Sequence, residues 1–164
     1  MPDQVILKTK SQTKPEILGS CKKDNDDSGA YKMKFKANGT LIEFTVQGSL
    51  TASFSQSGSV NNGVFTGYDA NSNMGLQVYD SKAFEESTYS GYVWTGSAFV
   101  GALMGYSDKT GTLYTQGTTN SNATINIIEI TSTTVRGTFN GTVKADGKPD
   151  ISITEGEFFV WRTN

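Results

Sequence analysis

Hydrophobic and polar side chains alternate along most of the chain after residue 30. In the segment YKMKFKANGTLIEFTV (31–46), the alternation runs on both sides of Asn38-Gly39, a dipeptide typical of two-residue hairpin turns with positive φ angles. A hairpin centred on this turn places Lys34 opposite Glu43, which is an attractive cross-strand pair. The other face of the hairpin collects the apolar side chains, which we expect to face the core: Tyr31, Met33, Phe35, Ile42, Phe44 and Val46.

Short alternating segments continue to the end of the chain, separated by Gly, Asn, Asp and Ser residues that are typical of tight turns. Only the segment SKAFEESTY (81–89) has a helical pattern, for one or two turns at most. Repeated short strands without βαβ units predict an all-β fold. We expect an antiparallel β-sandwich of about eight to ten strands, with a closed calycin-like β-barrel as the alternative. The further strands are expected at 49–55, 63–68, 74–79, 97–106, 111–117, 123–131, 133–145 and 150–162.

The first 29 residues differ from the rest of the chain in composition. They hold one short apolar run, Val5-Ile6-Leu7, among scattered lysines and before a charged end, so we predict a disordered leader and tether over residues 1–29. Residues 30–164 are expected to form a single all-β domain. The whole chain carries 14 basic and 16 acidic residues, net −2, which gives no electrostatic reason to expect a nucleic-acid partner.

The residue types that commonly carry catalysis are scarce in this chain. It has no histidine, the commonest general base and metal ligand, and its single cysteine rules out an intramolecular disulfide. No apolar run approaches the roughly 20 residues that cross a bilayer as a helix. We therefore expect a protein that is not an enzyme and that has neither a cofactor nor a transmembrane segment.

The C-terminal third of the chain carries a distinctive series of motifs. VRGTFNGT (135–142) ends one strand, Asp146-Gly147 forms a turn signal, and a last strand runs through ISITEGEF (151–158). This series resembles the ending of small Bacteroidetes lipoproteins with an uncharacterised all-β domain. The segment 111–130 and the opening hairpin also look like strands of that family, so that the resemblance covers roughly residues 30–160.

The family resemblance extends to the stretch around the only cysteine. LGSC (18–21) looks like a lipobox, and KKDNDD (22–27) is similar to the charged tether that sends such lipoproteins to the outer face of the outer membrane. The resemblance implies lipid attachment at Cys21 and a cell-envelope location, either anchored to the outer membrane or periplasmic. If the leader as written is genuine, we expect a cytoplasmic protein, because charged residues occupy the apolar core that a signal peptide needs: Lys8, Lys10, Lys14 and Glu16.

The segment TYSGYVWTGSAFVGALMGY (88–106) is the best candidate for a binding surface. Its alternation places Tyr92 and Trp94 on one face of a strand, and Tyr89 lies just before them. Aromatic ring faces can stack on the C–H patches of sugars while nearby amides and hydroxyls bind the sugar hydroxyls. The sequence therefore predicts Tyr89, Tyr92 and Trp94 as ligand-binding residues, although aromatic residues of this kind commonly belong to the core.

A weaker candidate for a metal site lies in YDANSNMGLQVYD (68–80). Asp69, Asn71 and Asn73 occupy alternate positions, and Asp80 falls at the twelfth place, as in a calcium-binding loop. Met74 stands where such a loop needs glycine, and a polar loop without a metal is the competing interpretation.

Three functions remain open from the sequence. The leading one is a non-enzymatic, cell-surface β-domain that binds a glycan or another envelope component. The second is a structural or assembly protein that acts through protein–protein contacts. The third is a β-barrel carrier of a small apolar ligand, which would require an internal cavity. The oligomeric state stays undetermined.

Overall fold

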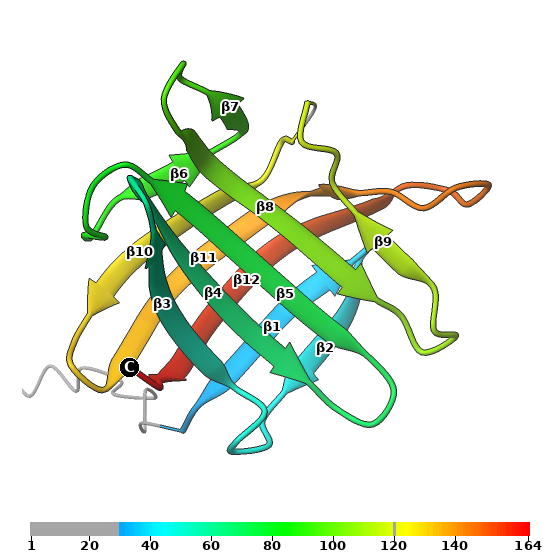
Figure 1. The fold of residues 1–164 in the computed structure, drawn as a ribbon. Coiled ribbons are helices and arrows are strands. Elements are labelled where there is room, and N and C mark those ends of the chain that lie inside the picture. Colours follow the sequence, from blue (N-terminus) through cyan, green and yellow to red (C-terminus); the bar gives the residue numbers. More distant parts are fainter. Residues whose placement is uncertain (1–29, 120) are drawn as a thin grey trace, which may run out of the picture.

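The computed structural model describes residues 30–119 and 121–164, and in this part of the chain it contains twelve strands and no helix (Figure 1). The strands are β1 (Lys32–Ala37), β2 (Thr40–Phe44), β3 (Thr51–Ser57), β4 (Val60–Tyr68), β5 (Asn73–Asp80), β6 (Thr88–Ser90), β7 (Tyr92–Trp94), β8 (Phe99–Ser107), β9 (Leu113–Thr115), β10 (Thr124–Ile130), β11 (Thr134–Val143) and β12 (Ile151–Arg162).

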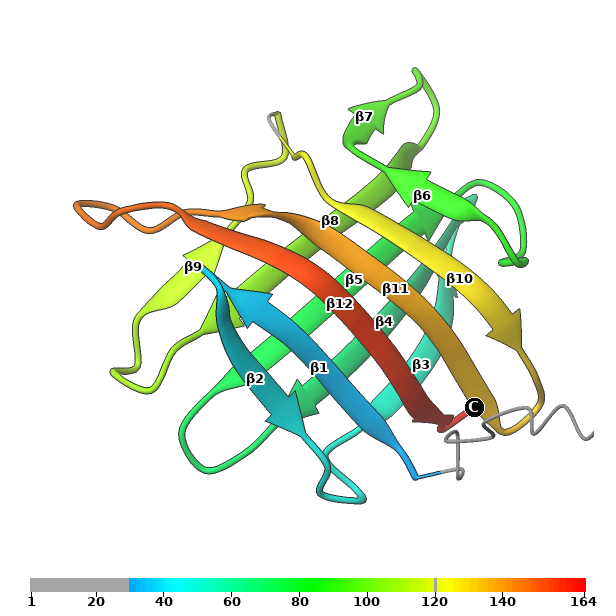
Figure 2. The same cartoon turned by 180° about the vertical axis from the view of Figure 1, so that it is seen from behind.

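All twelve strands belong to one mixed, mostly antiparallel sheet, which folds over on itself and is not closed into a barrel. Its main path is β6-β10-β11-β12-β3-β4-β5-β8-β7, with the hairpin β1–β2 attached to β12 and with β9 attached to β8. The parallel pairing of β12 with β3 is the point at which the sheet turns from one layer to the other. We call β3, β4, β5, β7, β8 and β9 the front layer, and β1, β2, β6, β10, β11 and β12 the back layer (Figures 1 and 2).

The prediction of an all-β fold is confirmed, and several finer expectations need correction. The described chain forms twelve strands rather than eight to ten, in one continuous sheet with a parallel pairing rather than two antiparallel sheets. The short helix expected at 81–89 is absent, because Phe84 packs its ring against Phe54 and Tyr89, and residues 88–90 pair with β10 as β6. Isolated short helices are marginal, so tertiary contacts override that local preference.

The predicted register of the first hairpin is confirmed. Lys34 lies opposite Glu43, and both turn residues have positive φ, 48° at Asn38 and 83° at Gly39. The core face is confirmed in its central part, since Met33, Phe35 and Phe44 are fully buried. Val46 was expected in the core but is 60% exposed, because β2 ends at Phe44 and the Val46 carbonyl accepts hydrogen bonds from the Ser49 backbone N–H and hydroxyl.

Aromatic rings fill the space between the two layers. Phe35 of the back layer contacts the ring of Tyr106 in the front layer, with centroids 5.4 Å apart, and also the ring of Phe139 at 5.8 Å. Phe65 of the front layer stacks on Phe158 of the back layer at 5.0 Å. Buried aromatic side chains supply most of the apolar area in such a core, so these contacts hold the layers together.

Two reciprocal phenylalanine–glycine pairs seat the rings of the back layer. Phe158 lies directly opposite Gly137, and Phe139 lies directly opposite Gly156 in the pairing of β11 with β12. A Cβ atom on Gly137 would overlap the Asn126 carbonyl oxygen and would lie 2.5 Å from the ring Cζ of Phe158. A Cβ on Gly156 would similarly overlap the Phe139 carbonyl oxygen and meet its ring. Each ring thus occupies the space that its cross-strand partner leaves empty.

We predict that Gly137→Ala lowers the free energy of unfolding by about 1–3 kcal/mol, the usual cost of overpacking a core. Gly75→Ala is the matched control, because a Cβ at this strand glycine of the front layer would meet nothing within 4 Å. Urea denaturation of both variants measures the difference. Equal stabilities would show that the Asn126 carbonyl and the Phe158 ring can both move aside at no cost.

Candidate functional site

Charged residues are segregated between the two layers. Among the strands that the structure describes, those of the front layer carry a single charged side chain, Asp80, whereas those of the back layer carry nine. Several charges of the back layer form ion pairs, such as Lys34–Glu157 at 3.2 Å and Lys36–Glu155 at 2.8 Å. The outer face of the front layer is therefore the electrically neutral face of the described domain.

Four aromatic rings lie in contact at one end of this neutral face, and we call them the aromatic platform: Tyr79, Tyr92, Trp94 and Phe99. Tyr92 and Phe99 stack with centroids 4.8 Å apart and an interplanar angle of 5°. Trp94 meets Phe99 at 4.9 Å with a tilt of 56°, and Tyr79 meets Tyr92 edge to face at 5.2 Å. Trp94 is 58% exposed and Phe99 is 40% exposed, so both side chains present solvent-accessible apolar area to a ligand.

The chain geometry around Gly91 explains how the platform is held. Gly91, with φ 63°, carries the chain from β6 in the back layer to β7 in the front layer. Its N–H donates to the Ala123 carbonyl at 3.0 Å, and its own carbonyl accepts from the Ala102 N–H. Gly101 faces this crossing without room for a Cβ atom, which would lie 2.8 Å from the Gly91 carbonyl carbon. The crossing thus brings β7 onto the outer edge of β8 and places Tyr92 beside Tyr79.

Polar groups adjoin the platform on β5. The Tyr79 hydroxyl donates to the Gln77 side-chain oxygen at 2.9 Å, which leaves the amide N–H₂ of Gln77 as a potential donor to a ligand. Burial raises the pKa of Tyr79. Burial also raises the pKa of Tyr92, and the neighbouring Tyr79 hydroxyl adds a smaller effect in the same direction. Both hydroxyls therefore stay protonated at neutral pH. The Tyr79 proton is donated to Gln77, and the Tyr92 hydroxyl can donate to a ligand.

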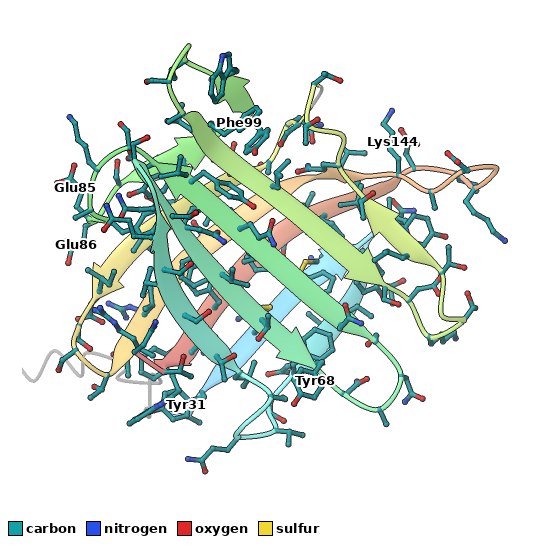
Figure 3. All side chains as sticks on the ribbon, viewed as in Figure 1. Tyr31, Tyr68, Glu85, Glu86, Phe99 and Lys144 are labelled. Atoms are coloured by element: carbon teal, nitrogen blue, oxygen red, sulfur yellow. The ribbon has the colours of Figure 1, made fainter. Side chains whose placement is uncertain are left out.

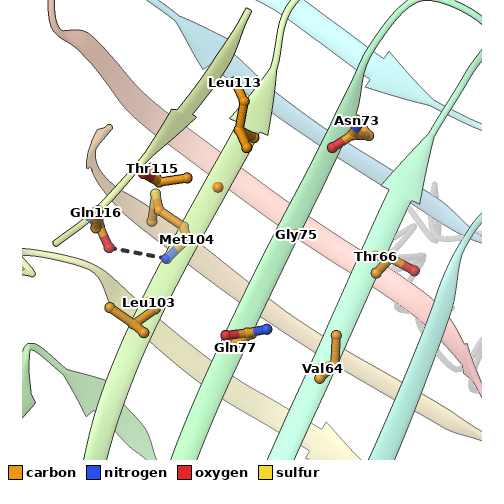
Figure 4. Close-up of a pocket in the computed structure, with 11 residues that line it drawn as sticks. Val64, Thr66, Asn73, Gly75, Gln77, Leu103, Met104, Leu113, Thr115 and Gln116 are labelled. Carbon is orange, nitrogen blue, oxygen red and sulfur yellow. Dashed lines mark hydrogen bonds between the residues drawn. The ribbon is translucent and has the colours of Figure 1, made fainter. Parts of the chain in front are cut away.

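A hollow of about 360 Å³ continues the same face beyond Gln77 (Figure 4). Its floor is the pair Gly75–Gly105, which lie directly opposite each other on β5 and β8, and we call the hollow the glycine trough. The Gln116 side-chain oxygen accepts a hydrogen bond from the Met104 backbone N–H at 3.1 Å, at one side of the trough. The trough is bordered by uncharged side chains, among them Val64, Thr66, Asn73, Gln77, Leu103, Leu113 and Thr115.

The structure separates the three aromatic residues that the sequence singled out. Tyr92 and Trp94 lie together on the platform, whereas Tyr89 is only 7% exposed and packs against Phe84 at the edge of the core. Sequence reasoning missed Tyr79 and Phe99. Phe99 could have been found from the sequence, because the short turn that follows Trp94 makes these two residues cross-strand partners. The contact of Tyr79 with Tyr92 depends instead on the pairing of β5 with β8, which are well separated in the sequence.

The four candidate metal ligands do not converge. Asp69 lies in the β4–β5 turn, where its Oδ1 accepts from the backbone N–H groups of Asn71 at 2.7 Å and Ser72 at 2.8 Å. Asn73 begins β5 and Asp80 ends it, so about 23 Å of strand separates them. Within the described residues, no group of three or more His, Cys, Asp or Glu side chains could hold a metal ion.

The proposed lipid-attachment residue, Cys21, and the rest of the leader and tether lie outside the described residues. In the part of the chain that the structure covers, no helix has the length and apolar character of a membrane span.

Comparisons with known protein families, with curated proteins and with solved structures give no match for this chain.

The Asp69 turn has a stability that depends on pH. Hydrogen bonds from the backbone of Asn71 and Ser72 hold the pKa of Asp69 below its ordinary value of 3.8. A carboxylate whose pKa is lower in the folded state stabilises the fold above the unfolded-state pKa and loses this effect as pH falls through the folded-state pKa. We predict that Asp69→Ala lowers the melting temperature at pH 7, and that the difference from the natural chain shrinks at pH 2.

Asp69→Asn is the control for this prediction, because it keeps an oxygen acceptor in the turn without the titrating charge. Thermal melts followed by circular dichroism measure all three proteins at both pH values. A destabilisation by Asp69→Ala that is as large at pH 2 as at pH 7 would contradict the role of the ionised carboxylate.

Proposed function

We propose that this protein is a non-enzymatic carbohydrate-binding domain whose ligand stacks on the aromatic platform. The observation that carries the proposal is the exposure of Trp94 and Phe99 as contacting rings beside Tyr92. Apolar ring faces of this kind match the C–H patches of sugar rings, while neighbouring hydroxyls and amides match sugar hydroxyls. Gln77, Tyr79 and Tyr92 supply such polar groups at the platform.

The position of the platform favours a surface ligand over a carried one. An apolar ligand inside the fold would need space between the layers, where Phe35, Tyr106 and Phe139 are in ring-to-ring contact. Trp94 and Phe99, by contrast, present accessible area without help from another chain. These contacts support a ligand on the outer face.

The test is affinity electrophoresis through gels that contain a soluble polysaccharide, with a β-1,3-glucan, an α-glucan, a galactomannan and an arabinoxylan as separate probes. We expect at least one neutral polysaccharide to retard the protein, and Trp94→Ala to weaken that binding at least about tenfold, as loss of an aromatic anchor does. Because Trp94 is largely exposed, the variant should keep the melting temperature of the natural chain.

Trp161→Ala is the matched aromatic control. Trp161 is 45% exposed and packs edge to face with Tyr31 on the back layer, away from the platform. This variant should bind the polysaccharide like the natural chain. Equal retardation of the natural chain and Trp94→Ala, or no retardation by any of the four polysaccharides, would refute the proposed function.

We also propose that the domain works at the cell envelope, held there through Cys21. The lipobox-like LGSC (18–21) and the charged residues after it support this location. We predict that the protein isolated from the membrane fraction of its own host begins with an acylated Cys21, as mass spectrometry of the N-terminal peptide would show. An intact Met1 in the soluble fraction would refute the envelope location and leave the binding proposal standing.

A further inference from the structure

The aromatic platform and the glycine trough form one continuous surface along the front layer. Side chains at alternate positions of a strand share a face, so Tyr79, Gln77 and Gly75 of β5 all point outward together. On β8 the outward positions run from Phe99 through Leu103 to Gly105, opposite those of β5. Gln77 lines the trough and also accepts the hydrogen bond from Tyr79, which joins the two parts.

This surface is long. From Tyr79 to Asn73 it follows β5 for about 20 Å, at about 3.3 Å per strand residue. Phe99 and Tyr68, which are labelled in Figure 3, lie near opposite ends of the front layer, and both rings are exposed. A surface of this shape fits the middle of a chain molecule rather than one terminal sugar.

The two trough glycines have no packing role in the core. A Cβ atom on Gly75 would meet nothing within 4 Å, and one on Gly105 would make only ordinary contacts, at 3.6 Å or more. Neither residue has a φ angle that requires glycine. Glycine weakens a strand interior, and it commonly marks a place where a ligand approaches the backbone closely. The pair therefore leaves room for an occupant on the outer face.

Because this surface carries no charge, it favours an uncharged ligand over an anionic one. Hydroxyl, amide and aliphatic groups border the trough, and its lining contains no charged side chain among the described residues. An anionic polysaccharide would meet no cation there, whereas an uncharged one finds partners for both its hydroxyls and its C–H faces.

We infer that the ligand is a linear, uncharged glycan that lies lengthwise along the front layer, with some sugar rings stacked on the aromatic platform and others seated in the glycine trough. This inference rests on the proposed function, and it adds the charge, the minimum length and the direction of the chain.

The test is calorimetry with disaccharides and hexasaccharides of four neutral series: cellobiose and cellohexaose, maltose and maltohexaose, laminaribiose and laminarihexaose, mannobiose and mannohexaose. In at least one series we expect the hexasaccharide to bind the natural chain at least about tenfold more tightly than the disaccharide. Gly75→Leu fills the trough and should remove most of this gain, while leaving the disaccharide affinity within about twofold.

Thr138→Leu is the matched control, because it adds the same side chain to the outward row of β11 in the back layer. It should bind both sugars like the natural chain. If Gly75→Leu does not fold, Leu113→Ala replaces it as the variant, since it removes an exposed apolar side chain that borders the trough and is not part of the platform. That variant should also reduce the gain from chain length.

The outcomes separate the inference from the proposed function. The trough would be ruled out as a binding site, and the platform would remain one, if disaccharide and hexasaccharide bound with equal affinity. The same would follow if Gly75→Leu kept the full gain in affinity of the hexasaccharide over the disaccharide. Tighter binding of hexagalacturonate than of every neutral hexasaccharide would overturn the uncharged class. Absence of binding in all series, together with absence of retardation by polysaccharides, would overturn both.

Discussion

The reciprocal seating of Phe158 over Gly137 and of Phe139 over Gly156 is the packing constraint on which this two-layer fold depends. Because neither glycine has a side chain, each ring can occupy the space above its cross-strand partner. Phe158 then stacks on Phe65 of the opposite layer, and this contact fixes which face of β4 points inward. Since β5 pairs with β4, and β8 pairs with β5, the same contact decides which side chains of β5 and β8 point outward. The exposed surface is thus a consequence of the core.

The sequence predicted best where turn chemistry and alternation act over short distances. The register of the first hairpin follows from Asn38-Gly39 and from alternation alone, and the structure reproduces it. The expectation for Val46 was wrong because alternation cannot tell where a strand ends. The joining of the layers through β12 and β3 depends on a parallel pairing of only two residues on each strand, and no local pattern announces such a contact.

The candidate site shows the same division between local and distant information. Tyr92 and Trp94 are two positions apart in a strand, so alternation in the sequence was enough to place their side chains on the same face. Tyr89 was grouped with them because they are neighbours in the chain, but Gly91 carries the chain between layers and leaves Tyr89 inside. Tyr79 reaches Tyr92 only because β5, β8 and β7 lie side by side, which the sequence does not reveal. The neutral face likewise emerges only when strands far apart in the chain are assembled.

Two pairs of strand glycines in this protein have different physical meanings. At Gly137 and Gly156 a side chain would collide with the core, so glycine follows from packing. At Gly75 a side chain would project into open space, and glycine there costs stability through its backbone entropy without any gain inside the fold. A second glycine, Gly105, lies directly opposite it, so the bare strip spans two strands. Packing requirements of the fold account for the first pair, whereas nothing in the packing of the fold requires the second, which is why we propose that an external molecule approaches the backbone there.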